Sequence, residues 1–439
     1  MLSDEDKLRQ FLLENEHAGE PTAFIRLQWI DFSGVLRARF VPVARCLQIA
    51  QGNEQYLLPQ VSMIIPISTA PKCFPTGTEV ERWVLRPDWS SLRVCGFRPS
   101  HASVMCFLEH KEAEDTFNKC PRMLLSRALK RLEREWDTRV LAGFEIEFML
   151  LDEDSQPLKQ LDRLNSYQTT AGLRGQTLEI VEEILDSFDK SSIPVHHFHT
   201  ETHDQIEFAL SPEPLLDAID SLILAQETIR TVFIKHNIKA TMTPKPLLDG
   251  PTNGIHLHMS VDKLAPPDTD NFLAGILSNT GSLCAFGMAN FDGYVRTAKD
   301  AAGAWVGFGT ENRDLPVRKI SEQHWEFRML DGTSNPYLFS AAVLLAGLRG
   351  LSEKVDLSWT DCPVFPHLMD ERERAQYGLD KRMPNGLEEA LEALKSDETV
   401  KEWIPEDLLK SYIPVKEKEV EVFQKMTDDE RRVKFLEYF

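Results

Sequence analysis

The stretch Gly143-Phe144-Glu145-Ile146-Glu147-Phe148-Met149-Leu150 alternates large apolar residues with two glutamates. Successive side chains of a β-strand point to opposite faces, so Glu145 and Glu147 share one face and the apolar side chains share the other. Two carboxylates this close repel each other unless a cation lies between them. The stretch therefore predicts a strand with one buried face. Its acidic face either holds a cation or is a solvated surface.

Three further stretches alternate in the same way. Residues 204–208 place Gln205 and Glu207 on one face, residues 255–259 place His256 and His258 there, and residues 325–329 place Glu326 and Arg328 there. Each pair alone has an ordinary interpretation, such as a structural histidine pair or an ion pair across a strand face. Four such faces in one chain instead favour a site for divalent metals and anions. Because carboxylates outnumber imidazoles, Mg²⁺ or Mn²⁺ suits the set better than structural Zn²⁺.

A basic segment at residues 309–319, interpreted as a loop, adds Arg313, Arg318 and Lys319. The guanidinium group fits phosphate and carboxylate oxygens in pairs, although a solvated basic loop has the same composition. The chain has no P-loop and no Rossmann glycine pattern. Any nucleotide must therefore be held by metal ions and arginines, since hard divalent ions commonly bridge nucleotide phosphates.

Composition excludes several classes of protein. The 439 residues carry a net charge of −20 without a basic run, which argues against nucleic acid and anionic membranes as partners. The seven cysteines are scattered and form no CxxC pair, so neither a disulfide framework nor a zinc ribbon is expected. The first residues are acidic rather than signal-like, and no apolar run approaches 18 residues. We expect a soluble, cytoplasmic protein of two or three domains.

Hydrophobic periodicity predicts the main elements. Strands are expected at 23–30 and 35–43, paired as a hairpin, near 82–85 and 103–109, and within 196–210. Helices are expected at 4–16, 121–136, 177–188, 212–236, 336–348 and 387–394. The helix at 336–348 is apolar on all sides, which predicts a buried helix with Asn335 as its N-cap and Pro336 in its first turn. Residues 151–175 are polar and predict a loop or lid.

With these motifs in order, the chain resembles the glutamine synthetase family, in particular its type I-like branch found in fungi. The matching stretches are 143–148, 199–207, 239–247 (KATMTPKPL), 253–260 (NGIHLHMS), 311–319 (ENRDLPVRK) and 324–350. The resemblance implies an α+β fold with an N-terminal β-grasp domain at residues 1–112. It also implies a catalytic domain at residues 113–439, with a curved antiparallel sheet, or half-barrel, backed by helices.

The resemblance also implies a role for each matching residue. One metal ion would be held by Glu147, Glu201 and Glu207, and a second, on the nucleotide phosphates, by Glu145, His256 and Glu326. Arg296 and Arg328 would contact a glutamate-like acid, Arg313 and Arg318 the transferring phosphoryl group, and His258, Ser260 and Arg318 the nucleotide. The implied enzyme is an ATP-dependent carboxylate–amine ligase with two or more Mg²⁺ or Mn²⁺ ions. Its subunits would form a ring-shaped homo-oligomer with shared active sites.

One departure from the family pattern affects a metal ligand. The segment at residues 198–207 is one residue shorter than expected, and Thr202-His203-Asp204 replaces a glycine-containing bend. Glu201 is the predicted ligand, but His199 could take its place.

A second departure concerns the amine. Ammonium-using members have an acidic residue in the N-terminal domain and a glutamate on a flap, but residues 66–72 contain no acid. The flap at 297–303 has Ala301 or Ala302 at the corresponding position, with Asp300 close enough to compensate. We therefore expect a γ-glutamyl-amide ligase that uses an organic amine. The alternatives are a true glutamine synthetase that uses ammonium and a catalytically silent relative that acts as a regulatory or structural oligomer.

Overall fold

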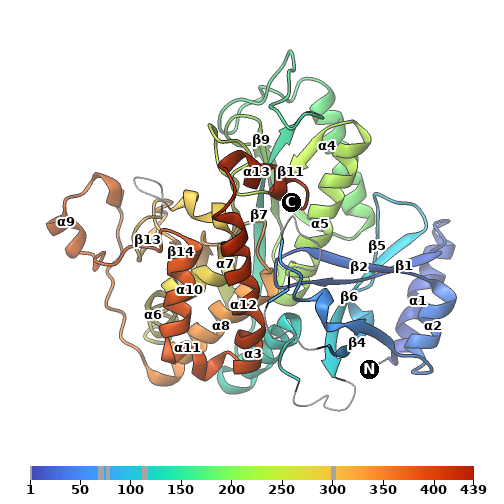
Figure 1. Ribbon diagram of the computed structural model, residues 1–439, viewed down its shortest axis with the longest axis horizontal. Coiled ribbons are helices and arrows are strands. Elements are labelled where there is room, and N and C mark those ends of the chain that lie inside the picture. The colour runs from blue at the N-terminus through green and yellow to red at the C-terminus, as the bar shows by residue number, and fades with distance from the viewer. Residues whose placement is uncertain (1, 68–73, 76–79, 111–116, 298–302) are drawn as a thin grey trace.

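The polypeptide forms two β-sheets, one within the first 110 residues and one in the remainder (Figure 1). The computed structural model describes residues 2–67, 74–75, 80–110, 117–297 and 303–439. The family-like α+β architecture predicted from the sequence is confirmed, including the curled half-barrel sheet of the larger unit. The division into domains at residue 112 falls in a segment outside the described residues and stays a prediction.

The N-terminal sheet has its longest strand, β6, at the centre. Its strands are β1 (Phe24–Ile30), β2 (Leu36–Pro42), β3 (Tyr56–Pro59), β4 (Arg82–Pro87), β5 (Arg93–Val94) and β6 (His101–His110). The order is β2-β1-β6-β4-β3, with β5 also on β6, and among these described strands only β1 and β6 pair in parallel. The predicted β1–β2 hairpin is confirmed. The first helices, α1 (Asp4–His17) and α2 (Val43–Ala50), pack against each other beside this sheet.

The second sheet carries the motifs identified in the sequence. Its strands are β7 (Val140–Leu151), β8 (Val195–Thr200), β9 (Gln205–Leu210), β10 (Glu213–Pro214), β11 (Lys239–Thr241), β12 (Ile255–Val261), β13 (Phe308–Thr310), β14 (Val317–Ser321) and β15 (His324–Phe327). The order is β13-β14-β15-β12-β7-β9-β8, with β10 and β11 also on β7, and within the described part of the sheet only β13 and β14 pair in parallel. The opening stretch is thus the middle of β7, and it joins the two halves of the sheet.

The helices of the larger unit lie beside this sheet and extend well beyond it, with α9 projecting away from the rest of the molecule (Figure 1). They are α3 (Pro121–Trp136), α4 (Gln176–Lys190), α5 (Leu215–Lys235), α6 (Asp268–Ser278), α7 (Thr280–Gly287), α8 (Pro336–Glu353), α9 (Glu371–Ala375), α10 (Leu387–Ser396), α11 (Glu398–Trp403), α12 (Glu406–Phe423) and α13 (Asp428–Leu436). Helix α5 packs on β7, where the Phe148 ring lies 5.9 Å from the rings of both Phe208 and Phe233. This packing accounts for the apolar half of the β7 alternation.

Helix α8 is the buried helix that the sequence predicts. It packs against α3, α6 and α7, and the Asn335 side chain accepts a hydrogen bond from Leu338 N as its N-cap. The amide of Asn335 also donates to the carbonyl oxygens of Ile30 and Asp31 at 3.2 Å, which ties the β1–β2 turn to the start of α8. At Gly34 in that turn, φ is +80° and a Cβ atom would lie 2.0 Å from the Thr333 carbonyl oxygen. Glycine is therefore required where the two units meet.

Several predicted boundaries need correction. The basic segment at 309–319 is not one loop, because its ends belong to β13 and β14 and Arg318 lies on a strand. Residues 196–210 form two strands, β8 and β9, which pair with each other. Helix α5 begins at Leu215 rather than at 212, since residues 213–214 pair with β7 as β10. The predicted loop at 151–175 contains no helix and no further strand.

Within the described part of the chain, no helix is both long and apolar enough to cross a lipid bilayer.

Candidate active site

Strand register brings the four alternating motifs together on the polar face of the half-barrel. Glu145 on β7 pairs with His256 on β12, and Glu147 pairs with Glu207 on β9. One strand further out on each side, Glu326 on β15 is opposite His258, and His199 on β8 is opposite Glu207. Because every motif alternates with period two, this register places all its ionisable side chains on the same face.

One cluster surrounds the first imidazole of β12. The His256 Nδ1 atom lies 3.0 Å from Glu145 Oε2 and 3.3 Å from Glu326 Oε1. A second imidazole, His258, places Nε2 3.1 Å from Glu145 Oε1. Glu145, His256 and Glu326 each offer a ligand atom, and these atoms lie within 4.8 Å of one another. The predicted nucleotide-side ligands therefore converge.

A second cluster forms on the other side of the same imidazole. The Nε2 atom of His256 lies 3.6 Å from Glu147 Oε1, while Glu147 Oε2 accepts a hydrogen bond from Gly254 N at 2.5 Å. Glu147, Glu207 and His256 again offer atoms within 4.8 Å of one another. Two neighbouring positions for a cation thus share His256, with Glu145 on one side and Glu147 on the other.

His199 and Glu201 both lie close to this second cluster. His199 Nε2 is 3.1 Å from Glu207 Oε1, whereas its Nδ1 atom is 3.9 Å from Glu201 Oε2. That Glu201 oxygen is buried and has no hydrogen-bond partner among the described residues. Burial, followed by repulsion from Glu147 and Glu207, raises the pKa of Glu201 to about 7. A carboxyl in this state is suited to accept a cation in place of its proton.

The charge states of the first cluster also fit a metal site. Burial opposes ionisation of Glu326, but Arg328 and His256 lower its pKa to about 2. Burial likewise opposes ionisation of Glu145, and hydrogen bonds from His256 and His258 hold its pKa well below the usual range. Carboxylates with one or two imidazoles are donors for hard or borderline divalent ions. The residues present therefore fit the two-metal arrangement.

Arginines surround these clusters. Arg318 Nη1 donates to Glu326 Oε2 at 2.9 Å, and Arg328 forms an ion pair with the other oxygen of Glu326. Arg296 is held by the backbone, donating to the carbonyl oxygens of Leu330 at 2.7 Å and Arg328 at 2.9 Å. Arg313 lies further out, where its Nη1 atom donates to the Tyr167 hydroxyl at 3.3 Å. The four predicted arginines thus lie around one region, with Arg313 at its rim.

Two cavities open on opposite sides of the clusters. The Glu147 cavity, about 300 Å³, is lined by Glu147, Glu201, His256, Arg296 and Arg328 among others. The Glu145 cavity, about 440 Å³, is lined by Glu145, His258 and Ser260 together with Leu141, Phe144 and Leu210. The first has arginines for an anion, whereas the second has apolar walls and imidazoles. Both reach the size range of small-molecule sites.

The sequence prediction missed some residues of this region. His324 lies 3.1 Å from His258, and it shares the face of Glu326 because it lies two residues before it. Strand alternation could therefore have identified it. His197, grouped with His199 and Glu207, has the same relation to His199. Tyr167 lies in the long loop, where no periodic pattern marks it. The predicted amine-site residues Asp300, Ala301 and Ala302, and most of 66–72, lie outside the described residues.

Comparison with known proteins identifies relatives over the whole chain. The family model described as glutamine synthetase, catalytic domain, matches residues 118–434. Protein fluG of Emericella nidulans is 30% identical over 451 residues, which cover 100% of this chain and 51% of fluG, so the chain spans about half the length of that relative. Type-1 glutamine synthetase 1 of Dictyostelium discoideum is 24% identical over 95% of this chain and 89% of its own. A solved structure described as a GmaS/ADP complex has the same fold, with a TM-score of 0.80, 22% identity, and coverage of 96% and 98%.

Proposed function

Since the chain belongs to the glutamine synthetase family, we propose that it is an ATP-dependent ligase that joins the side-chain carboxylate of glutamate, or of a similar acid, to an organic amine. The observation that carries this proposal is the placement of two different cavities on either side of paired acidic clusters. A ligase of this class must bring an acid and a nucleotide to the same metal ions from opposite directions. The Glu147 cavity suits the acid, and the Glu145 cavity suits the nucleotide.

The arginines would bind and orient the reacting groups. Arg296 and Arg328 line the Glu147 cavity and would hold the carboxylates of the acid. Arg318, anchored on Glu326, and Arg313 at the rim would hold the oxygens of the transferring phosphoryl group. These fixed guanidinium groups stabilise charge that is redistributed in the transition state.

Glu145, His256 and Glu326 would hold the nucleotide-side ion, and Glu147, Glu201 and Glu207 the acid-side ion. When bound, such ions offset the negative charge of phosphate and carboxylate oxygens. His199 contacts Glu207 and would orient it, unless it replaces Glu201 as a ligand.

The bond changes balance in two steps. A carboxylate oxygen of the acid attacks the γ-phosphorus of ATP, the bond to the β-phosphate oxygen breaks, and ADP leaves. The amine nitrogen then attacks the acyl carbon, phosphate leaves with its oxygen, and one proton passes from nitrogen to a base or to water. The products are an amide, ADP and phosphate.

The preference for an organic amine is supported by the sequence around the site. Residues 66–72 contain no acid, and the flap at 297–303 has alanines where ammonium-using members have a glutamate. A carboxylate in this pocket would attract ammonium and help to remove its proton. Without it, an amine with an apolar substituent is the better fit.

The test is an ATP-consumption assay with glutamate, Mg²⁺ and a panel containing ammonium, methylamine, ethanolamine, aromatic amines and amino acids, with the amide product identified by mass spectrometry. We expect at least one organic amine to give a higher kcat/KM than ammonium. Faster turnover with ammonium than with every organic amine would refute the preference for an organic amine. The assignment as an ATP-dependent ligase would still hold. If nucleotide binds but no amide forms with any acid–amine pair, the silent relative is the better interpretation.

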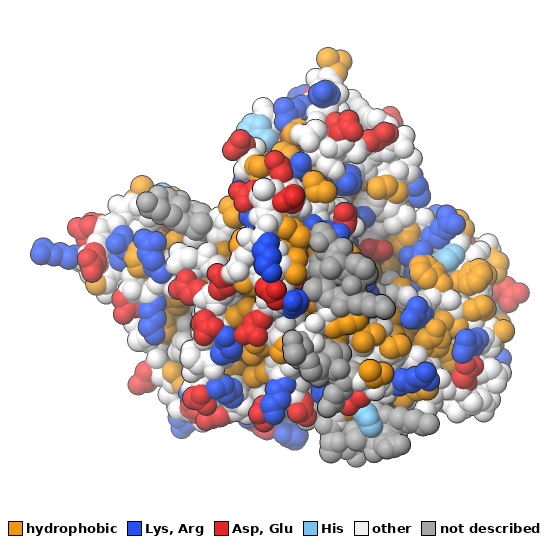
Figure 2. Space-filling model, in the orientation of Figure 1, with side chains coloured by type: hydrophobic (Ala, Val, Ile, Leu, Met, Phe, Trp, Pro, Cys, Tyr) orange, Lys and Arg blue, Asp and Glu red, His pale blue; other side chains and the backbone are white. Residues whose placement is uncertain are grey.

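We further propose that the chain forms a ring-shaped homo-oligomer. Hydrophobic side chains gather over the N-terminal sheet on the face shown in Figure 2, and Phe24 on β1 and Phe40 on β2 are 41% and 57% exposed. Strand β2 is an edge strand of this sheet, and exposed apolar groups on such a strand are typical of an interface. Light scattering behind size exclusion should give a mass of several subunits, and Phe40→Glu should reduce it.

A further inference from the structure

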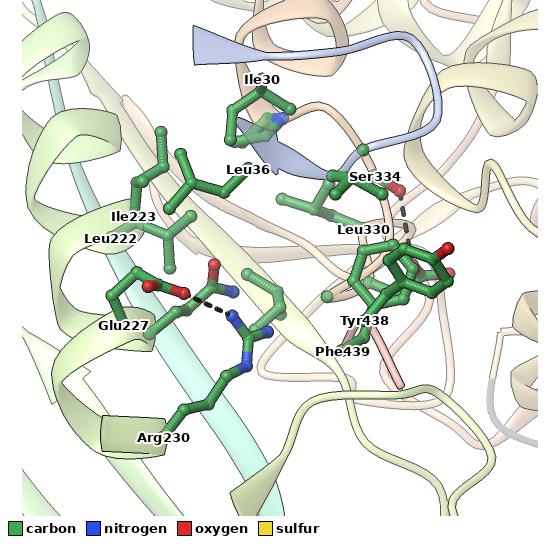
Figure 3. Close-up of a pocket in the computed structure, with 17 residues that line it drawn as sticks. Ile30, Leu36, Leu222, Ile223, Glu227, Arg230, Leu330, Ser334, Tyr438 and Phe439 are labelled. Atoms are coloured by element: carbon green, nitrogen blue, oxygen red, sulfur yellow. Dashed lines mark hydrogen bonds and ion pairs between the residues drawn. The ribbon is translucent and has the colours of Figure 1, made fainter. Parts of the chain in front are cut away.

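A third cavity, about 80 Å³ and separate from the two described above, lies between the β1–β2 hairpin, α5 and the last residues of the chain (Figure 3). Leu222, Ile223 and Arg230 line it from α5, Leu36 from the hairpin, and Leu330 and Tyr438 from the opposite side. We call it the Arg230 cavity. Its volume corresponds to about five water molecules at roughly 15 Å³ each, so it has room for a small organic molecule.

The guanidinium group of Arg230 has few partners for its charge. Its Nη1 atom lies 3.5 Å from Glu227 Oε1, at the outer limit of a hydrogen bond. Its Nε atom is buried and has no partner among the described residues. Figure 3 shows Glu227 and Arg230 directed toward each other at the edge of the cavity. Since a guanidinium has five N–H donors, most of its hydrogen-bonding capacity is unused by the described residues.

Arg230 and the apolar walls of the cavity resemble a binding site for a carboxylate more than a structural ion pair. Burial lowers the pKa of Arg230, which reflects a charge that neighbouring groups do not fully offset. Partly buried charges without good partners are costly, and a bound anion removes that cost. The apolar walls formed by Leu222, Ile223 and Leu36 fit a short hydrocarbon stem. Glu227 contacts one nitrogen of the Arg230 guanidinium and leaves its other donors to a ligand.

We propose that the Arg230 cavity is a second ligand site, which binds a small carboxylate with a short apolar stem. The carboxylate pairs with Arg230, and the stem lies against the α5 leucine and isoleucine. A ligand here does not react, because the nearest proposed phosphoryl-transfer residues lie on the other side of the wall formed by residues 330–332.

That wall connects the site to the Glu147 cavity. Leu330 lines the Arg230 cavity. Its carbonyl oxygen accepts hydrogen bonds from Arg296 at 2.7 Å and from Ile255 N at 3.2 Å. Asp331, the next residue, also lines the Arg230 cavity, and its charge acts on Arg296. Arg296 in turn lines the Glu147 cavity. A bound carboxylate that shifts residues 330–331 would therefore alter how Arg296 holds the acid substrate.

The test uses propanoate as the probe, with propanamide as its neutral isostere, in saturation-transfer NMR on the full chain. We expect propanoate to bind the wild type and Arg328→Gln, and to bind Arg230→Gln at least tenfold more weakly. Lys235→Gln, on an exposed part of the same helix, serves as the matched control and should bind as the wild type does. Equal binding to Arg230→Gln, equal binding of propanamide, or loss of binding in Arg328→Gln alone would overturn the proposal.

Folding is checked with Arg230→Met. If Arg230 awaits a ligand, this variant keeps or raises the melting temperature without propanoate and no longer gains stability when it is added. A marked fall in melting temperature would show that Arg230 is a structural residue. The coupling, which rests on the proposed function, predicts that propanoate changes the KM for glutamate in the wild type but not in Arg230→Gln. The binding of propanoate does not depend on catalysis. Failure of the second-site proposal can therefore be told apart from failure of the proposed ligase function.

Discussion

Glu145 and Glu147 lie two residues apart on β7, yet they contact opposite nitrogens of one imidazole. Glu145 Oε2 is 3.0 Å from His256 Nδ1, and Glu147 Oε1 is 3.6 Å from His256 Nε2. The second oxygen of Glu147 is fixed by Gly254 N, whereas the second oxygen of Glu145 faces His258. The two carboxylates therefore take part in two different clusters, one toward each cavity.

We predict that the two glutamates have separable roles. Glu147→Gln should lower kcat for acyl-phosphate formation by roughly 100-fold or more, because it removes charge stabilisation at the reacting carboxylate. Glu145→Gln should chiefly weaken Mg–ADP binding, by about 10- to 100-fold as for other metal-site changes. Single-turnover ADP formation from ATP and calorimetric ADP binding measure the two effects. Glu133→Gln, on exposed surface, is the control, and wild-type behaviour of both site variants would contradict the assignment.

The arginines on either side of Glu326 should also differ in effect. Glu326 is fully buried between Arg318 and Arg328, and of these two arginines Arg328 lines the Glu147 cavity. Lysine keeps the charge but loses the paired donors of arginine. We expect Arg328→Lys to raise the KM for the acid about tenfold, and Arg318→Lys to lower kcat with little change in that KM. Lys319→Gln on the same strand should change neither constant appreciably, and the reverse pattern would exchange the two roles.

The sequence predicted much of this site because strand alternation has a period of two. Once the four motifs are assigned to strands, residues two positions apart must share a face of the sheet. This holds for Glu145 and Glu147, and likewise for His256 and His258. The pairing between strands is different, since nothing in the β7 or β12 sequence specifies that Glu145 lies opposite His256. Only the family resemblance indicated which strands are neighbours, and the structure supplies the register.

Contacts between segments that are far apart in the chain could not be predicted from the single sequence. Asn335 was predicted as an N-cap from its position before Pro336, but its bonds to Ile30 and Asp31 join residues about 300 positions apart. Arg230 lay unnoticed in an amphipathic helix, because its lack of partners depends on what packs around it. Arg318 was assigned to a loop, since β14 is short and its strand pairing comes from β13 and β15.

Metal affinity should depend on pH through Glu201. Its pKa of about 7 lies above the usual value, so below pH 7 a metal ion must displace a proton from the folded protein. The apparent Mn²⁺ affinity should fall about tenfold per pH unit below 7 and level off above about pH 8. In the metal-free protein, the same group contributes stability fully below its unfolded pKa, and that contribution is lost as pH rises from about 4.5 to 7.

Mn²⁺ titrations at pH 6, 7 and 8, followed by electron paramagnetic resonance, measure this dependence. Glu201→Gln should reduce the slope of affinity against pH by about one proton. His199 also has a raised pKa, mainly through its hydrogen bond with Glu207, so His199→Gln is the informative comparison. His199 would be the ligand if the slope of affinity against pH persisted in Glu201→Gln and disappeared in His199→Gln. Nitrogen coupling to the manganese signal would then also be lost in His199→Gln.

Removing one member of a fully buried ion pair should be strongly destabilising where α12 meets the N-terminal unit. Lys416 Nζ lies 2.9 Å from Glu419 Oε2, both side chains are 0% exposed, and the other oxygen of Glu419 accepts a hydrogen bond from Ile67 N at 2.9 Å. Lys416→Met leaves the Glu419 carboxylate buried, with Ile67 N as its one remaining hydrogen-bond partner among the described residues. Because removing one member of a buried pair strands the other charge, we expect a loss of about 3–5 kcal/mol.

Thermal and urea unfolding of a small set of variants tests this expectation. The double variant Lys416→Met/Glu419→Leu should recover much of the lost stability, since no charge is then left unpaired, although the hydrogen bond to Ile67 N is gone. The exposed pair Glu406–Lys410 on the same helix is the matched control, and Lys410→Met should change stability by no more than about 0.5 kcal/mol. If Lys416→Met behaved like Lys410→Met, Glu419 would have to be neutral in the folded protein, and its bond to Ile67 N would then be the main link between α12 and that segment.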